Sequence, residues 1–156
     1  MKKILFSLTL LIIFLLNIGK VHSIEADVFI QSVVNRAAKT LSGSFTKEER
    51  VERLKDIARE TVDIDGLAFY SLGAHRKNLS KDQVDEYKKV FTKYFLKSFS
   101  SRLAEYSNPE IEVESKRVIN KNYTIVSSIL VSTENRPAVK IEWRVYTKDP
   151  NNLLIR

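Results

Sequence analysis

The sequence predicts an α+β domain in which N-terminal helices pack on one face of a C-terminal antiparallel sheet, as in nuclear-transport-factor and cystatin-like folds. Up to about residue 106, apolar residues recur every three or four positions, which is the period of amphipathic helices. After Asn108-Pro109 the period becomes two, which is typical of strands. Short turns separate the expected strands, and this favours a meander. Helices followed by a run of strands indicate segregated layers around one core.

Three helices are expected before residue 73. Residues 26–42 carry a continuous apolar stripe. Thr46 and Glu49 form a capping-box pattern, in which each side chain satisfies a free amide at a helix start, and a second helix follows to about Val62. A short third helix is expected over residues 64–72.

The longest helix is expected from a second capping box, Ser80 to Gln83, to about Tyr106, before Asn108-Pro109 stops it. At about 1.5 Å per residue, this helix is about 39 Å long. Its apolar face is rich in aromatic residues: Val84, Tyr87, Phe91, Tyr94, Phe95, Phe99, Leu103 and Tyr106.

Strands are expected over residues 111–119, 123–133 and 138–147, and a fourth begins at residue 153. The third is the clearest, because its apolar and charged residues alternate strictly. Its expected inward side chains are Val139, Ile141, Trp143 and Val145.

The first 23 residues have the pattern of an export signal. A basic start precedes the apolar run Ile4 to Ile18, which is shorter than the roughly 20 residues of a membrane-spanning helix. Val21-His22-Ser23 offers a cleavage site after Ser23. We therefore expect a cleavable signal peptide over residues 1–23, one domain over residues 24–156, and export, in a bacterium to the periplasm.

Charge and composition exclude several classes of function. The formal charge is +7, and loss of the three lysines before residue 24 leaves +4, spread among acidic residues. Without a basic stripe, nucleic-acid binding is not expected. The chain has no cysteine, which excludes thiol catalysis and cysteine metal sites.

No catalytic constellation is visible. His75 is the only histidine after residue 23, and Asp63 and Asp65 are spaced as helix caps rather than as a catalytic pair. The glycines do not form a phosphate-binding pattern. We expect no metal, no cofactor and no enzymatic activity. The prominent apolar faces either pack together as an ordinary core or enclose a ligand cavity.

Several segments in order resemble the MlaC family, also called toluene-tolerance (Ttg2-type) auxiliary proteins. The similar segments are Tyr70-Ser71-Leu72-Gly73, Ser80-Lys81-Asp82-Gln83, Val90-Phe91 through Tyr94-Phe95-Leu96 to Tyr106, and Val139 to Tyr146 around Trp143. The resemblance spans about residues 26–156. It implies a soluble periplasmic carrier that ferries glycerophospholipids between the outer and inner membranes and so maintains outer-membrane asymmetry. It also implies two partners, an inner-membrane ABC lipid transporter complex and an outer-membrane lipoprotein complex.

Carriage of a phospholipid requires a deep apolar cavity. Two acyl chains carry about 30 methylenes, whose exposure costs about 24 kcal/mol at about 0.8 kcal/mol each. A groove covering half of them leaves about 12 kcal/mol unmet. From the expected inward faces we predict eight wall residues: Leu72, Phe91, Phe95, Phe99, Ile125, Ile129, Ile141 and Trp143.

The chain departs from the resemblance at its end, because relatives continue beyond the last strand into a C-terminal helical segment. We therefore expect a shortened monomeric domain with an exposed sheet edge and a lipid site open on one side. Three alternatives stay open. One is an isomerase or hydratase of nuclear-transport-factor-like fold, in which Tyr87 or Tyr94 would act. The second is a purely structural periplasmic module, and the third is a non-functional fragment.

Overall fold

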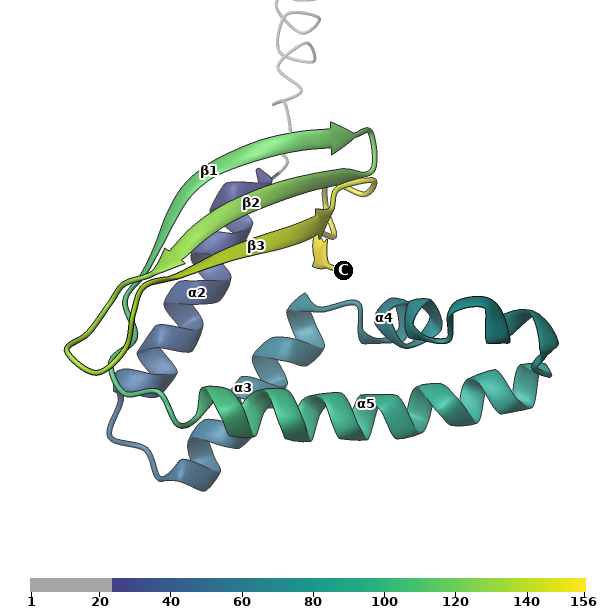
Figure 1. The fold of residues 1–156 in the computed structure, drawn as a ribbon, viewed down its shortest axis with the longest axis horizontal. Helices are drawn as coiled ribbons and strands as arrows, with labels where there is room; N and C mark the ends of the chain where they lie inside the picture. The colour runs from purple at the N-terminus through teal and green to yellow at the C-terminus, as the bar shows by residue number, and fades with distance from the viewer. Residues whose placement is uncertain (1–23) are drawn as a thin grey trace, which may run out of the picture.

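The computed structural model describes residues 24–156, so the expected signal peptide and its cleavage site lie outside the described residues. The helices follow one another without long connections (Figure 1). They are α2 (Ala26–Ser42), α3 (Lys47–Thr61), α4 (Ile64–Ser71), the 3₁₀ helix η1 (Gly73–Asn78) and α5 (Lys81–Leu103).

Side-chain caps fix where three of the helices begin. Thr46 with Glu49, and Ser80 with Gln83, form complete capping boxes at α3 and α5. Asp63 accepts a hydrogen bond of 2.9 Å from the third amide of α4. These contacts confirm the predicted starts, because each satisfies amides that have no partner within the helix. The 3₁₀ helix lies between the third and the longest of the expected helices, where no element was expected.

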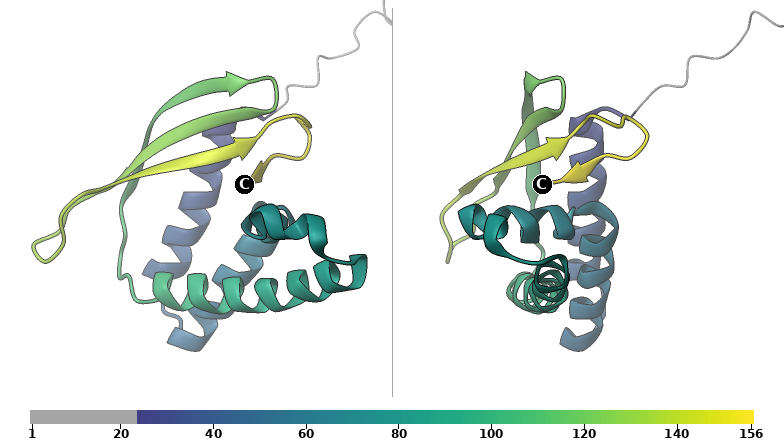
Figure 2. Two further views of the ribbon diagram at one scale, coloured as in Figure 1. Left: turned by 45° about the vertical axis from the view of Figure 1, so that its right-hand side comes forward. Right: turned by 90° about the vertical axis from the view of Figure 1, so that its right-hand side faces the viewer.

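A four-stranded antiparallel meander in the order β1-β2-β3-β4 follows the helices. Its members are β1 (Ile111–Asn120), β2 (Tyr123–Leu130), β3 (Val139–Tyr146) and β4 (Leu154–Ile155). The views in Figures 1 and 2 place the helices on one side of the curved sheet, with α2 against it and α5 farther away. The predicted α+β class is confirmed.

The strand register decides which side chains face the helices. Val126 of β2 lies opposite Trp143 of β3, and Ser128 lies opposite Ile141. Directly opposed residues share one face of a sheet. Thr124, Val126 and Ser128 are all buried, so this face is the one covered by the helices.

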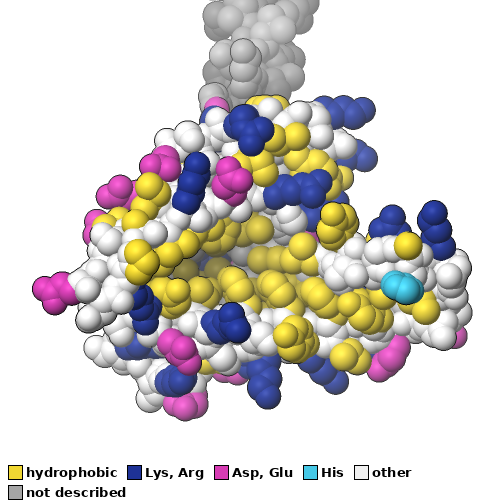
Figure 3. Space-filling model, in the orientation of Figure 1, with side chains coloured by type: hydrophobic (Ala, Val, Ile, Leu, Met, Phe, Trp, Pro, Cys, Tyr) yellow, Lys and Arg dark blue, Asp and Glu magenta, His cyan; other side chains and the backbone are white. Residues whose placement is uncertain are grey.

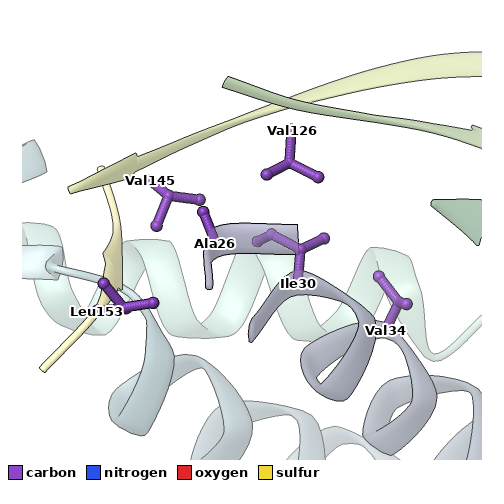
Figure 4. Packing of buried hydrophobic residues seen from close by; sticks show 6 residues of the cluster. All are labelled: Ala26, Ile30, Val34, Val126, Val145 and Leu153. Atoms are coloured by element: carbon purple, nitrogen blue, oxygen red, sulfur yellow. The ribbon is translucent and has the colours of Figure 1, made fainter. Parts of the chain in front are cut away.

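The core between α2 and the sheet is made of aliphatic side chains. Ala26, Ile30 and Val34 of α2 meet Val126, Val145 and Leu153 (Figure 4). Burial of one such side chain contributes about 1.5–3 kcal/mol. This cluster fastens α2 to the sheet and leaves the more distant α3 and α5 to form the opposite wall of the space described next.

Ile125 and Ile129 lie on the other face of the sheet, which corrects the predicted phase of β2. They are paired with Arg144 and Lys140, whose side chains are exposed. Because β2 carries β-branched or apolar residues in both phases, its pattern did not distinguish the two faces. Pairing with β3 and packing against α2 make the distinction, and they turn Val126 and Ser128 inward.

Candidate functional site

An apolar pocket of about 340 Å³ lies between the sheet and the helices. Figure 3 shows hydrophobic side chains gathered in the hollow between the sheet and α5. The helical side of the lining consists of Val33, Val34, Ala37, Ala38, Leu41, Leu54, Ile57, Ala58, Thr61, Val62, Phe99, Leu103 and Tyr106. The other side consists of Pro109, Ile111, Leu130, Val139, Ile141, Trp143 and Ile155.

Small side chains on the helices create this space. Ala37 and Ala38 of α2 and Ala58 of α3 line the pocket, where larger aliphatic residues would fill it. Cores are normally packed almost without voids. Alanines at three inward helix positions therefore leave room next to α5 that the protein itself does not occupy.

Trp143 forms the best-fixed part of the sheet wall. Its indole Nε1 donates a hydrogen bond of 2.8 Å to the hydroxyl Oγ of Ser128, which is completely buried. This bond satisfies both polar groups away from water and sets the orientation of the indole. Ile141, opposite Ser128 in the sheet, also lines the pocket.

A row of aromatic rings runs along α5 toward the pocket. The ring centroids of Phe91 and Phe95 are 6.2 Å apart, and those of Phe95 and Phe99 are 5.3 Å apart, both in stacked geometry. All three rings are half-buried against the cluster around Ala58, Ile64 and Leu96. Phe99 is the member that reaches the pocket lining.

The structure thus distributes the eight predicted wall residues over four places. Phe99, Ile141 and Trp143 meet in the pocket, and Phe91 and Phe95 lie beside it on the aromatic row. Leu72 is buried at the end of α4, outside the lining. Ile125 and Ile129, on the opposite sheet face, do not reach it.

Prediction from the sequence missed the contribution of α2 and α3. Val33, Ala37, Leu41 and Ile57 belong to the inward stripes that define these helices, yet the wall was expected from α5, the sheet and Leu72. The available signal was the small size of the alanines within an otherwise aliphatic stripe. Such small side chains leave a gap wherever the facing elements do not approach closely enough to fill it.

Besides the indole N–H of Trp143, two hydroxyl side chains line the pocket. Thr61 donates from Oγ1 to the backbone oxygen of Ile57 at 2.7 Å, so its hydroxyl is already engaged. Tyr106 carries the guanidinium of Arg136 over its ring at 4.4 Å. Such a lining excludes water from an apolar ligand and offers no charged group to react with it.

The two tyrosines considered for catalysis lie outside this pocket. The hydroxyl of Tyr87 is 2.9 Å from that of Ser71, which joins α5 to α4. The side chain of Tyr94 is largely exposed. Within residues 24–156, no three carboxylate or imidazole side chains gather closely enough to hold a metal ion.

An ion pair joins the residue after β4 to the start of α4. The guanidinium of Arg156 pairs with the carboxylate of Asp63, and its Nη1 donates to the Tyr123 hydroxyl at 3.2 Å. The Tyr123 hydroxyl, and then Asp63, raise the pKa of Arg156, against a lowering by burial. The backbone amide of Asp63 also donates to the Ile155 oxygen at 2.9 Å, so β4 is attached to the start of α4.

The family model described as MlaC protein matches residues 29–155, which is most of the chain. The chain belongs to the MlaC family. The matched range contains α2 from Phe29 onward, the other helices and the whole sheet, so the pocket lies entirely within the family region. None of the described helices has the length and apolar character that a membrane span requires. No curated protein matches the chain.

The fold of the chain is similar to that of a solved structure from Ralstonia solanacearum. That structure is of a phospholipid-binding protein in complex with a phospholipid. The two share 15% sequence identity with a TM-score of 0.69, and the match covers 85% of this chain and 75% of the other. The same arrangement of helices and sheet is therefore built from largely different side chains.

Proposed function

We propose that this chain binds a phospholipid, with the acyl chains in the apolar pocket between the helices and the sheet. The observation that carries the proposal is the pocket itself: apolar side chains from three helices and the sheet surround unfilled space. Membership of the MlaC family and the fold shared with a phospholipid-binding protein support it.

The pocket alone is too small to enclose a whole phospholipid, so further apolar surface must contribute to binding. Its volume of about 340 Å³ lies near the lower end of the ~300–1,000 Å³ typical of small-molecule sites. The half-buried rings of Phe95 and Phe91 extend the apolar surface from Phe99 along α5. Each methylene removed from water along this path contributes about 0.8 kcal/mol to binding. Phe99, Ile141, Trp143, Phe91 and Phe95 are accordingly proposed as contacts of the acyl chains.

The proposed biological role is transport through the periplasm. A chain released from residues 1–23 after Ser23 would move freely between the outer and inner membranes, whereas an uncleaved anchor would hold it at one of them. In this role it exchanges phospholipid with an outer-membrane lipoprotein complex and an inner-membrane ABC transporter complex, and so maintains outer-membrane lipid asymmetry. It acts by binding and not by catalysis.

Extraction of bound lipid tests the binding step. The protein is purified from a bacterial periplasm without detergent, extracted with organic solvent and analysed by mass spectrometry. We expect close to one phospholipid per chain, while an unrelated exported protein purified in parallel gives only background. Protein that is folded but consistently empty, with a pocket that takes up no added phospholipid, would refute the proposal.

Transfer between vesicles tests the carrier role separately. Donor vesicles containing a self-quenched fluorescent phospholipid are mixed with unlabelled acceptors, and dequenching is followed with and without the protein. The carrier role predicts a rate that rises in proportion to protein concentration. Binding of lipid without any acceleration of transfer would leave a binding protein and remove the carrier.

A further inference from the structure

A second pocket, of about 350 Å³, has a lining that shares no residue with the apolar one. Three arginines line it: Arg76 from η1, Arg144 from β3 and Arg156 after β4. These residues are far apart in sequence, and only the tertiary fold brings their guanidinium groups to one place.

Aromatic rings hold all three guanidinium groups. Arg144 lies 4.0 Å from the ring centroid of Tyr123, Arg76 lies 5.1 Å from that of Phe69, and Arg156 lies 4.2 Å from that of Tyr146. A guanidinium stacked on a ring is restricted in orientation, while the N–H groups at its edge stay available as donors. This arrangement reduces the entropy that a ligand must remove on binding.

The pocket carries an excess of positive charge. Asp63 pairs with Arg156 and balances one charge. Over residues 24–156, neither Arg76 nor Arg144 forms an ion pair with a carboxylate. Two cations that line one pocket without a carboxylate partner leave an excess of positive charge, which an anion can neutralise.

The basic pocket lies directly beside the apolar one. Ile155 lines the apolar pocket, and the next residue, Arg156, lines the basic one. Consecutive Cα atoms are about 3.8 Å apart. Backbone hydrogen bonds from Asp63 to Ile155 and from Arg156 to Arg144 fix this boundary at 2.9 and 2.8 Å. Side chains of consecutive residues in an extended strand point to opposite sides, so the linings of the two pockets meet across the end of β4.

We propose that the pocket formed by Arg76, Arg144 and Arg156 binds a phosphate group, namely the phosphodiester of the lipid whose acyl chains lie in the apolar pocket. Planar guanidinium groups bind phosphate oxygens with paired, charge-assisted hydrogen bonds. The source of the phosphate rests on the proposed function. The same chemistry would also bind a free phosphate monoester, and the experiment separates these sources.

The test compares three probes: a lysophospholipid below its micelle concentration, a monoacylglycerol with the same chain, and glycerol 3-phosphate. Affinities are measured for the mature protein, for the variant R76Q/R144Q, and for the matched control R117Q/K121Q. The control removes two exposed cations at β1 and the following turn, outside both pockets. Arg76 and Arg144 are exposed, so we expect R76Q/R144Q to remain folded, with only a small change in thermal unfolding from the lost contacts with Phe69 and Tyr123.

We expect R76Q/R144Q to bind the lysophospholipid about tenfold or more weakly and the monoacylglycerol as before, with no change in the control. The variant R76K/R144K, which retains charge without the planar fork, should recover only part of the loss. Equal losses for both lipids, or no loss for either, would overturn the inference and leave the acyl pocket standing.

The glycerol 3-phosphate arm separates the two proposals. If the wild type binds neither lipid but binds glycerol 3-phosphate in a manner lost in R76Q/R144Q, the phosphate site stands, its ligand is soluble, and the lipid-binding proposal fails. If lysophospholipid affinity falls in R76Q/R144Q while glycerol 3-phosphate alone binds weakly, the phosphate belongs to the lipid. If R76Q/R144Q binds every probe as the wild type does, no phosphate site exists here.

Discussion

Replacing a small residue of the apolar pocket lining by a larger apolar one should raise the stability of the lipid-free protein and lower its affinity for lipid. Ala38 is the position of choice, because it lies on α2 in the lining, is only partly buried, and belongs to none of the three core clusters. Ala38→Leu adds three carbons to a helix position that tolerates leucine well. The added side chain therefore enters the space that we assign to the acyl chain.

The magnitude follows from the methylene value. Three carbons that displace three ligand methylenes cost about 2.4 kcal/mol at about 0.8 kcal/mol each, which weakens binding about 50-fold. The same carbons, buried within the empty protein, raise its free energy of unfolding by about 1–2 kcal/mol. A residue of an ordinary, filled core behaves oppositely, because overpacking there costs about 1–3 kcal/mol.

Two assays on the same samples check this prediction. Urea unfolding of lipid-free protein gives the change in stability, and uptake of a fluorescent phospholipid gives the change in affinity. Ala74→Leu is the matched control, since Ala74 is exposed in η1 and lies outside both pockets. We expect the control to bind lipid as the wild type does.

Two results would refute the reasoning. If Ala38→Leu raises stability but leaves phospholipid affinity unchanged, the acyl chains lie elsewhere. If it destabilises the protein as overpacking does, the space beside α2 is closed in solution and the chain has a filled core.

Three further changes test how the site is held. Trp143→Phe removes the hydrogen bond to Ser128 and leaves the buried Ser128 hydroxyl unpaired, so urea unfolding should show a loss of stability of about 1–3 kcal/mol. Adding Ser128→Ala to the same chain should restore part of this loss. If the stability losses of the two single variants simply add in the double variant, the two side chains do not interact. Asp63→Asn retains an acceptor for the α4 amide but removes the charge that pairs with Arg156, whereas Asp63→Ala removes both. Calorimetry should therefore show the alanine variant to be less stable than the asparagine variant by about 1 kcal/mol. Equal stabilities of the two variants would mean that the helix cap contributes nothing. Ser80→Ala should lower the free energy of unfolding by about 1 kcal/mol without changing lipid affinity, because Ser80 caps the end of α5 that does not line the pocket. A parallel loss of lipid affinity would show that the whole of α5 contributes to lipid binding.

The sequence by itself determined the elements and their order. Helix starts at Thr46 and Ser80 depend on side chains three residues away, and such local contacts can be recognised without the fold. The strict alternation in β3 likewise placed Ile141 and Trp143 on the inward face, where the structure has them. The apolar face of α5 was also local information: Phe91, Phe95 and Phe99 of that face form the stacked row, whereas Tyr94 is largely exposed.

Only the tertiary structure decided what that apolar material does. β2 has apolar side chains in both phases, and the choice of Val126 over Ile125 for the inner face depends on partners in β3 and α2. The pocket likewise depends on alanines of α2 and α3 that line one space, which no single helix reveals. Long-range packing, not local propensity, sets which faces meet and how much room they leave. For the same reason, Arg76, Arg144 and Arg156 form one basic pocket only in the folded chain.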